Sequence, residues 1–322
     1  MELLTISRLK AARSCQRLHQ LSYVDGYRPA KDADTLRFGT LIHRGLEAWW
    51  RGAGDQRLDA ALGALEGEAD PFELAKAQVL LTGYHVRWSA EVIETLGVEI
   101  EFRAPLINPE SHAPSRTYEL GGKIDALARL ADGRVAVVEH KTSAEDISPG
   151  SDYWKRLRMD GQVSIYFDGA KSLGHDVEVC LYDVIGKPGQ KPLKATPTES
   201  RKYTKDGRLY AAQRDCDETP EGYRARLTEA VAADPAGYYA RGEVVRLEAD
   251  LEDARFDVWQ TADQIRQARN AGHAPRNPGA CFSYGRLCAF FAVCSREASV
   301  EDPTLYRKLT VVHEELSQQA AP

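Results

Sequence analysis

The chain has 322 residues, of which 43% are hydrophobic and 28% are charged, and its formal net charge is −6. This balance is typical of a globular protein with a sizeable core rather than a disordered or membrane chain, and the acidic net charge argues against a protein that coats duplex DNA through a wide basic surface. The first residues carry charges, no signal-peptide pattern follows and no run of about 18 apolar residues occurs, so we expect a cytoplasmic protein without a membrane span.

Residues 1–96 are expected to form a helical N-terminal part. A helix is predicted over 5–24, with Thr5 or Ser7 as its cap, because apolar residues repeat there at three-residue spacing. Cys15 falls on this apolar stripe and is therefore expected to be buried.

A second helix is predicted to begin at Thr40, where Phe38-Gly39-Thr40 supplies a small-residue turn and a cap. His43 would then lie in the first turn of this helix. Two interpretations of His43 stay open: a functional imidazole, or a histidine packed under Trp49 or Trp50.

Three strands are predicted between 97 and 142, because apolar residues alternate along VEIEFRAPL, YELGGKIDALARL and RVAVVEHKT. The last two strands would form a hairpin around Ala131-Asp132-Gly133. These strands are expected to lie within a core of about 97–185.

A helix over 152–173 that ends at Gly174, followed by a strand over 177–185, completes the predicted core. A right-handed crossover would lay this strand parallel to 134–142 in one sheet. The sequence therefore predicts an α/β fold with a mixed central sheet flanked by helices.

Residues 215–322 are expected to form a C-terminal part that contains helices and a cluster of cysteines. Thr219-Pro220 is typical of a helix cap with a first-turn proline, and 249–270 is an amphipathic helix that closes at Gly272. No repeat or low-complexity segment occurs, and length alone does not decide between one domain and two; we expect a single domain over 1–322.

Two carboxylates are expected to project from the predicted hairpin. Glu139 and Lys141 share one face of their strand, and a three-residue loop at 131–133 would place Asp125 opposite Glu139. Adjacent carboxylates repel unless a cation such as Mg²⁺ or Mn²⁺ neutralises them, and such a site suits phosphodiester hydrolysis. The alternative is a Glu–Lys or Asp–Lys pair at the edge of the sheet.

Several short motifs resemble those of one nuclease superfamily. Gly122 to Asp125, Glu139 to Lys141 and Gln162 to Tyr166 resemble the G-x-x-D, E-x-K and Q-x-x-x-Y elements of the PD-(D/E)XK superfamily. Two upstream segments, 38–43 and 7–15, resemble those of its RecB-like branch. The resemblance spans most of 5–185 and again 281–294.

This resemblance implies a restriction-endonuclease-like core and a role for each matching residue. Asp125, Glu139, His43 and the backbone carbonyl of His140 would hold the metal ion, with His43 completing or tuning the site; Mn²⁺ accepts imidazole more readily than Mg²⁺ does. Lys141 would serve the attacking water. Gln162 and Tyr166, four residues apart on one helix face, would position the nucleic acid or would simply form the polar edge of an amphipathic helix.

The cysteines resemble those of AddB-like and CRISPR-associated RecB-like nucleases, in which one early and three late cysteines hold a 4Fe-4S cluster. The corresponding ligands here would be Cys15, Cys281, Cys288 and Cys294. The late spacing is C-x6-C-x5-C rather than the usual C-x2-C-x5-C, which makes the role of Cys281 the least secure. A four-cysteine zinc site and unligated thiols are the alternatives, and Cys180 and Cys216 are expected to be bystanders.

Residues 187–214 are locally basic, with eight lysines and arginines against two acidic residues. Lys202 and Lys205 are therefore candidates to contact the DNA backbone. The alternative is a solvated loop.

Together these features predict a Mg²⁺- or Mn²⁺-dependent DNA nuclease, expected to act as an exonuclease on DNA ends or single strands in phage or bacterial recombination or repair. No Walker A motif occurs, so a helicase would have to be a separate partner. Two alternatives are a catalytically idle DNA-binding subunit and a subunit whose iron–sulfur cluster has a structural or redox role.

Overall fold

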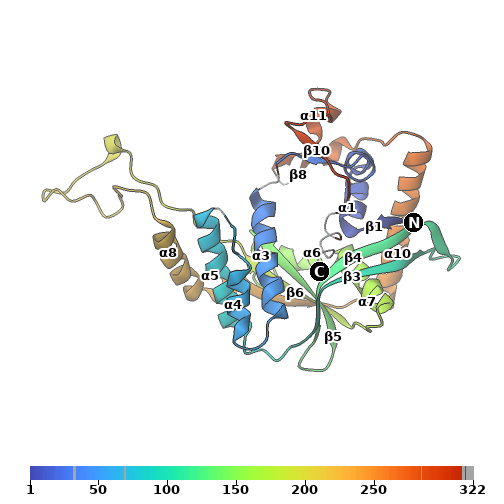
Figure 1. Cartoon of the computed structure of the whole chain (residues 1–322), viewed down its shortest axis with the longest axis horizontal. Coiled ribbons are helices and arrows are strands. Elements are labelled where there is room, and N and C mark those ends of the chain that lie inside the picture. The colour runs from blue at the N-terminus through green and yellow to red at the C-terminus, as the bar shows by residue number, and fades with distance from the viewer. Residues whose placement is uncertain (32–33, 69, 284, 314–315, 317–322) are drawn as a thin grey trace.

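The computed structural model describes all residues except 32–33, 69, 284, 314–315 and 317–322. Within these residues a six-stranded mixed sheet lies at the centre (Figure 1), with strand order β1-β4-β5-β6-β7 and with β3 paired to β4. Strand pairs β1–β4 and β5–β6 are parallel, and the other pairs are antiparallel. The strands are β1 (Glu2–Leu4), β3 (Glu94–Ile107), β4 (Pro114–Arg129), β5 (Val135–Ser143), β6 (Val179–Gly186) and β7 (Tyr239–Val244).

Helices cover both faces of the sheet, which confirms the predicted fold class (Figure 1). One face packs against α1 (Ile6–Ser14), α6 (Asp152–Leu157), α7 (Gly161–Ser172) and α10 (Glu248–Asn270). The other face packs against α3 (Asp34–Arg51), α4 (Gln56–Gly63), α5 (Pro71–Trp88) and α8 (Pro220–Ala233), and the short α9 (Pro235–Tyr238) precedes β7. Among the described residues, no helix is both long enough and apolar enough to cross a bilayer.

The alternation of side chains along β5 sorts residues between these two layers. Val137 belongs to the cluster under α1, α7 and α10, whereas Ala136 and Val138 belong to the cluster under α3 and α5. The predicted period of two is therefore confirmed for β5.

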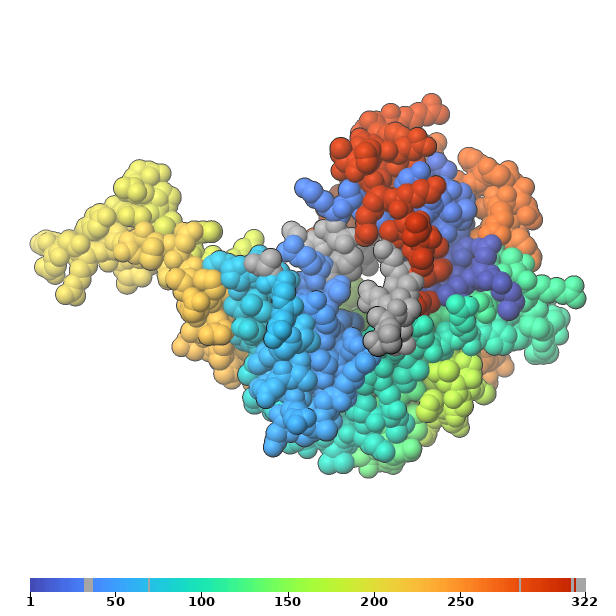
Figure 2. Space-filling model, viewed as in Figure 1, coloured from blue at the N-terminus to red at the C-terminus, as the bar shows by residue number. Residues whose placement is uncertain are grey.

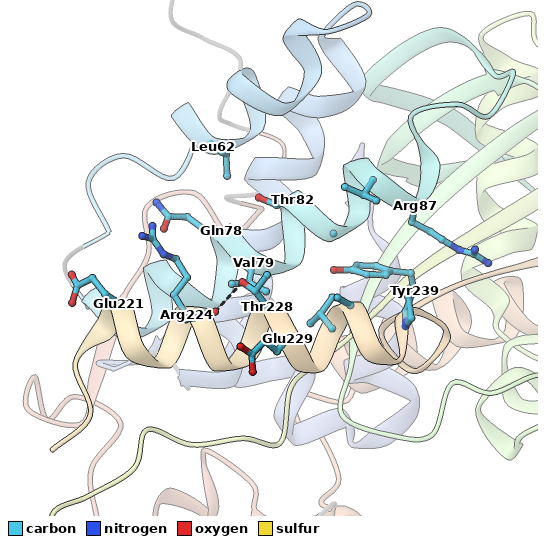
Figure 3. A pocket seen from close by; sticks show the side chains of 16 residues that line it. Leu62, Gln78, Val79, Thr82, Arg87, Glu221, Arg224, Thr228, Glu229 and Tyr239 are labelled. Atoms are coloured by element: carbon cyan, nitrogen blue, oxygen red, sulfur yellow. Dashed lines mark hydrogen bonds between the residues drawn. The ribbon is translucent and has the colours of Figure 1, made fainter. Parts of the chain in front are cut away.

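On the second layer α5 and α8 leave a groove of about 860 Å³ between them, lined by Val79, Thr82 and Thr228 among others (Figure 3).

The two ends of the chain meet in a small terminal lobe, which we define as residues 15–31 and 275–309. Its core is formed by Leu21, Phe290 and Tyr306, and β2 pairs with β10. Its elements are α2 (Gln16–His19), a π-helical turn (Gln20–Val24), β2 (Tyr27–Pro29), a 3-10 turn (Pro278–Ala280), β8 (Phe282–Ser283), β9 (Arg286–Leu287), α11 (Phe291–Cys294) and β10 (Tyr306–Lys308).

The predicted helix over 5–24 is wrong in its continuity. Thr5 caps α1 by accepting a hydrogen bond from the backbone of Arg8, as predicted, but α1 ends at Ser14. Cys15 is extended and half-buried, its sulfur accepts a hydrogen bond from the Asn277 backbone, and the Arg17 amide donates to the Pro275 carbonyl. These contacts with the other end of the chain replace the helical hydrogen bonds.

The predicted start of the second helix at Thr40 is also wrong. Helix α3 begins at Asp34, so His43 lies in the middle of the helix rather than in its first turn. Phe38 is buried in the core, and a Cβ on Gly39 would lie 3.4 Å from the Thr142 hydroxyl. The small residue therefore lets α3 approach β5 closely instead of capping the helix.

The helix predicted over 152–173 is interrupted. Asp160 has an extended conformation and accepts a hydrogen bond from the Gln162 backbone, so it caps a separate helix α7. The other elements agree with the sequence: Gly174 and Gly272 have positive φ after their helices, and Thr219 caps α8 ahead of Pro220. Strands β1 and β7 were not predicted.

Candidate active site

The site begins where β4 and β5 diverge. The two strands pair only between Ala126↔Val138 and Arg129↔Val135, and the Leu130 amide donates to the Arg134 carbonyl to close the predicted three-residue loop. Past Val138, β5 continues beside β6, so the His140 amide has no backbone partner on β4. The Asp125 carboxylate supplies one: its Oδ2 accepts from this amide at 2.8 Å.

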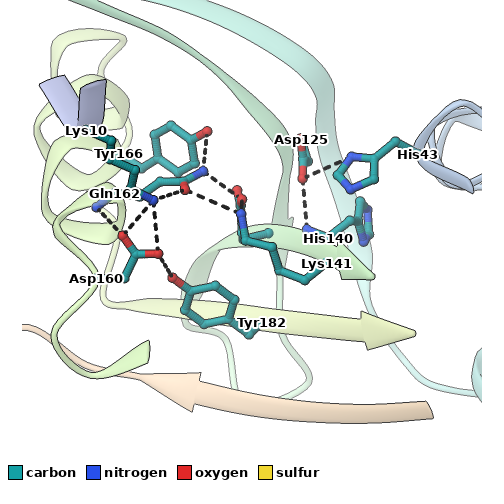
Figure 4. A network of polar contacts seen from close by, with 10 residues as sticks. Lys10, His43, Asp125, His140, Lys141, Asp160, Gln162, Tyr166 and Tyr182 are labelled. Carbon is teal, nitrogen blue, oxygen red and sulfur yellow. Dashed lines mark hydrogen bonds and ion pairs between the residues drawn. The ribbon is translucent and has the colours of Figure 1, made fainter. Parts of the chain in front are cut away.

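Glu139 lies beside Asp125 and is only 3% exposed. Its Oε1 accepts hydrogen bonds from the Lys141 ammonium and, at 2.7 Å, from the Gln162 amide (Figure 4). Its Oε2 is buried and has no partner within the described residues. A buried carboxylate oxygen without a partner is costly, and a cation at this oxygen would offset that cost.

His43 reaches the carboxylates from α3. Its Nδ1 lies 3.9 Å from Asp125 Oδ2, it hydrogen-bonds with the backbone of His140, and the two imidazole rings meet edge to face at 6.2 Å (Figure 4). The structure thus brings together His43, Asp125, Glu139 and the backbone of His140.

Burial and mutual repulsion set the charges of these groups. Burial, with the Glu139 charge, raises the pKa of Asp125 to about 7, and burial lowers the pKa of His43 although Glu139 opposes this. Burial acts against the charged form of Lys141, but Glu139 and Asp125 outweigh it and raise the pKa of this lysine above its ordinary value. The site therefore combines a neutral imidazole, two carboxylates that repel each other, and a permanent ammonium.

Gln162 and Tyr166 lie on one face of α7, as predicted, but both are buried. Gln162 Nε2 donates to Glu139 and lies 2.9 Å from the Tyr166 hydroxyl, while its Oε1 lies 3.4 Å from both Lys141 Nζ and Lys10 Nζ. In this structure the amide therefore contacts the Glu139 carboxylate directly.

Sequence reasoning missed Lys10 and Asp160. The Lys10 ammonium, on α1, lies 3.2 Å from Asp160, which also caps α7 and lies 3.4 Å from the Tyr182 hydroxyl (Figure 4). Lys10 is 152 positions from Gln162 in the sequence, so no local pattern could reveal this contact.

A second polar network lies behind the site, on the opposite side of β5. Asp183 is fully buried, ion-pairs with Arg241 at 3.0 Å, accepts from the Tyr84 hydroxyl and lies 3.3 Å from His140 Nδ1. Although burial acts to raise it, Arg241 and His140 hold the pKa of Asp183 well below its usual range. A signal was present, because an aspartate within the apolar strand VCLYDVIG requires a partner.

The donors fit a hard divalent cation in chemical type. Two carboxylates, a neutral imidazole and a peptide carbonyl suit Mg²⁺ or, with the imidazole, Mn²⁺. However, in the described ranges no three His, Cys, Asp or Glu side chains stand in the geometry of a metal site. Lys141 holds Glu139 Oε1, so Glu139 Oε2 is the oxygen left to bind the ion.

The four predicted cluster cysteines all lie in the terminal lobe, but no three of them stand in the geometry of a metal site in the described part of the chain. Burial raises the pKa of Cys288 and Cys294, and neighbouring thiols raise it further: Cys15 and Cys281 act on both. The Cys288 amide also donates to the Cys281 carbonyl. Cys180 is buried in β6 and Cys216 is exposed on a distant segment.

Lys202 and Lys205 are exposed and lie far along the chain segment that projects from the body. We call this segment, residues 187–218, the arm; Figure 1 and Figure 2 show it extending beyond α5 and α8. The structure therefore does not bring these two lysines to the carboxylates.

Comparisons with known proteins complete the description of the site. One solved structure that resembles this chain is the "Putative exonuclease" of Eubacterium rectale, with 10% identity and a TM-score of 0.47; the match covers 98% of this chain and 94% of that one. Another is SSO0001, with 17% identity and a TM-score of 0.22; the match covers 70% of this chain and 84% of that one. No curated protein matches the chain. The family model described as the PD-(D/E)XK nuclease superfamily matches residues 3–295, so the chain belongs to this superfamily.

Proposed function

We propose that the protein is a divalent-metal-dependent deoxyribonuclease. The observation that carries this proposal is the pair of carboxylates, Asp125 and Glu139, at the divergence of β4 and β5, with Lys141 beside them and Glu139 Oε2 unpaired. Members of this superfamily typically use divalent metals such as Mg²⁺. A bound ion would lower the pKa of a water molecule and offset charge on the phosphate.

We assign the remaining roles in the proposed reaction to residues of this chain. Asp125, Glu139, His43 and the carbonyl of His140 are the proposed metal ligands, and the charged Lys141 holds the attacking water and stabilises developing negative charge. A lysine with a raised pKa keeps its proton, so Lys141 acts as a cation rather than as a base.

We assign Gln162, Tyr166 and Lys10 as positioning residues. Gln162 fixes the orientation of Glu139 through its Nε2, and the Tyr166 hydroxyl accepts a hydrogen bond from the same nitrogen. The Lys10 ammonium contacts Oε1 of the Gln162 amide. Such contacts behind a metal ligand tune its geometry and typically change activity about 10- to 100-fold. This role replaces direct contact of Gln162 with nucleic acid in our proposal, because the amide is buried against Glu139.

We propose that the whole chain acts as one nuclease domain of the RecB-like branch, on DNA ends or single strands in recombination or repair. Support comes from the motif order and from a core that draws residues from Leu4 to Ile265 into one cluster. Since the sequence lacks a Walker A motif, an unwinding activity would come from a separate helicase.

We also propose that Cys15, Cys281, Cys288 and Cys294 hold a 4Fe-4S cluster. Their mutual proximity in the terminal lobe supports the proposal. Anaerobic purification followed by iron, sulfide and zinc analysis tests it: about four irons per chain are expected, zinc alone would assign a zinc site instead, and the absence of both metals would overturn a metal role for the lobe.

The catalytic proposal is tested with end-labelled single-stranded and duplex DNA in Mg²⁺ or Mn²⁺, with products sized over time. Glu139→Gln and Lys141→Ala should abolish cleavage while the fold remains, because the metal and water are no longer positioned. Binding without cleavage by the wild-type protein would identify a catalytically idle DNA-binding subunit, and cleavage at wild-type rates by both variants would overturn the assigned site.

A further inference from the structure

The arm is attached to the body through an ion pair at its base, between buried Glu218 and half-buried Arg226. Arg226 of α8 contacts both carboxylate oxygens of buried Glu218, at 2.9 and 2.8 Å, and also donates to the Lys191 carbonyl. The Glu218 amide and carboxylate bind the backbone of Leu193 in turn. These contacts join the outgoing and returning segments of the arm and fix both to α8.

The tip of the arm is a hairpin with a defined register. Tyr203 bridges Leu209 in antiparallel fashion, and the Tyr210 amide donates to the Lys202 carbonyl. The Thr204 amide donates to the Arg208 carbonyl, and Gly207, with φ of 74°, occupies the left-handed position that the tight turn needs.

This register sorts the exposed side chains of the tip by face. Opposed residues of an antiparallel ribbon point to the same side, and successive residues alternate. Lys202, Tyr210 and Arg208 therefore share one face, which we call the cationic face, while Tyr203 points to the other. Tyr210 and Tyr203 are 52% and 54% exposed, so each ring is open to solvent.

Two cations around an exposed aromatic ring match the chemistry of a single nucleic-acid strand. Lysine and arginine pair with phosphates, and a tyrosine ring offers a stacking surface to an unpaired base. Duplex DNA could satisfy the cations but keeps its bases stacked on one another, so it cannot use the ring. The cationic face is thus better suited to an unpaired strand than to a duplex.

We infer that the cationic face binds the single-stranded part of a DNA substrate away from the catalytic carboxylates, with Tyr210 stacked on a base. This inference rests on the proposed nuclease function and adds a second place, away from the carboxylates, where the protein contacts the DNA substrate. Because the arm extends beyond α5 and α8 (Figures 1 and 2), only a strand long enough to leave the body can reach it. The length of the DNA strand should therefore decide whether the arm contributes to binding affinity.

The experiment compares four proteins in a Glu139→Gln background that binds without cleaving: the unmodified arm, Lys202→Ala with Arg208→Ala, Tyr210→Ala, and Tyr203→Ala. Tyr203→Ala is a matched control, since it removes the same ring from the opposite face of the same hairpin. Affinities are measured for fluorescent single strands of about 6 and about 40 nucleotides and for a blunt duplex, over a range of salt.

Tyr210→Ala should weaken binding of the long strand about tenfold, with little effect on the short strand or the duplex. Tyr203→Ala should match the unmodified arm. The double lysine–arginine variant should reduce the salt slope for the long strand by about 1 to 2. Equal affinities of the two tyrosine variants for the long strand, or losses of the same size on the short strand, would overturn the inference.

The same variants with Glu139 intact separate this inference from the proposed function. Cleavage of the short strand at wild-type rates by all arm variants is expected. If the wild-type protein cleaves but the arm variants bind the long strand normally, the inference fails and the nuclease proposal stands; if the wild-type protein cleaves no DNA, the nuclease proposal fails.

Discussion

The two carboxylates proposed to bind the metal ion, Asp125 and Glu139, should destabilise the protein when no metal ion is present. The pKa of Asp125 rises from an ordinary value of 3.8 to about 7, because of burial and the nearby Glu139 charge. Between about pH 4 and pH 7 the folded state therefore binds more protons than the unfolded state, and the free energy of unfolding falls as pH rises. Over this interval the effect amounts to at most about 4 kcal/mol.

Replacing Asp125 by asparagine removes this cost and keeps the hydrogen bond, since an amide oxygen can still accept from the His140 amide. In a metal chelator at pH 8, Asp125→Asn should be more stable than the wild type by about 2 to 4 kcal/mol, and the difference should vanish near pH 4. Urea denaturation at several pH values measures both quantities. Asp176→Asn, at an exposed position, is the control and should change stability by about 0.5 kcal/mol or less.

Adding Mg²⁺ or Mn²⁺ should reverse the order of stability, so that the wild type becomes more stable than Asp125→Asn. A ligand at about 100 times its dissociation constant stabilises the folded state by about 2.7 kcal/mol, and only the protein that retains Asp125 should gain this fully. If Asp125→Asn is less stable than the wild type by a constant amount at pH 5 and pH 8 in chelator, the repulsion that we assign to the site is refuted.

Three other predictions test the surroundings of the site. Asp183→Asn should lower the free energy of unfolding by about 3 to 5 kcal/mol, because it removes the buried charge partner of Arg241 and leaves only exposed Glu91, whereas Glu243→Gln, in an exposed ion pair, should cost about 1 kcal/mol or less; equal losses in urea denaturation would contradict the buried pair. Gln162→Leu should slow single-turnover cleavage about 10- to 100-fold by releasing Glu139, and an unchanged rate would remove its positioning role. Cys15→Ser should lower both the metal content and the melting temperature, which Cys216→Ser should leave alone; equal metal content in the two would argue against Cys15 as a ligand.

The sequence was sufficient for features that depend on local periodicity. The alternation along β5 and the length of the loop at 131–133 predicted that Asp125 would lie opposite Glu139, and the spacing of four residues placed Gln162 and Tyr166 on one helix face. These relations follow from the backbone geometry of a hairpin and of a single helix.

The sequence did not predict features in which contacts between distant segments override the local preference for a helix or strand. Cys15 continues an apolar helical stripe, but contacts with Pro275 and Asn277 end the helix there. Contacts of Lys10 with the active-site amide likewise depend on how α1 packs against α7. No pattern within a window of about 18 residues carries such information.

The meeting of the two chain ends has a consequence for the order of events during synthesis. The Arg17 amide binds the Pro275 carbonyl, Arg13 binds Thr261, and β2 pairs with β10. Because these contacts need residues 261–308, residues 13–29 lack them until that part of the chain has been synthesised, and contacts at such separation form slowly. We therefore expect the terminal lobe to assemble after the central sheet, in which β1 pairs with β4.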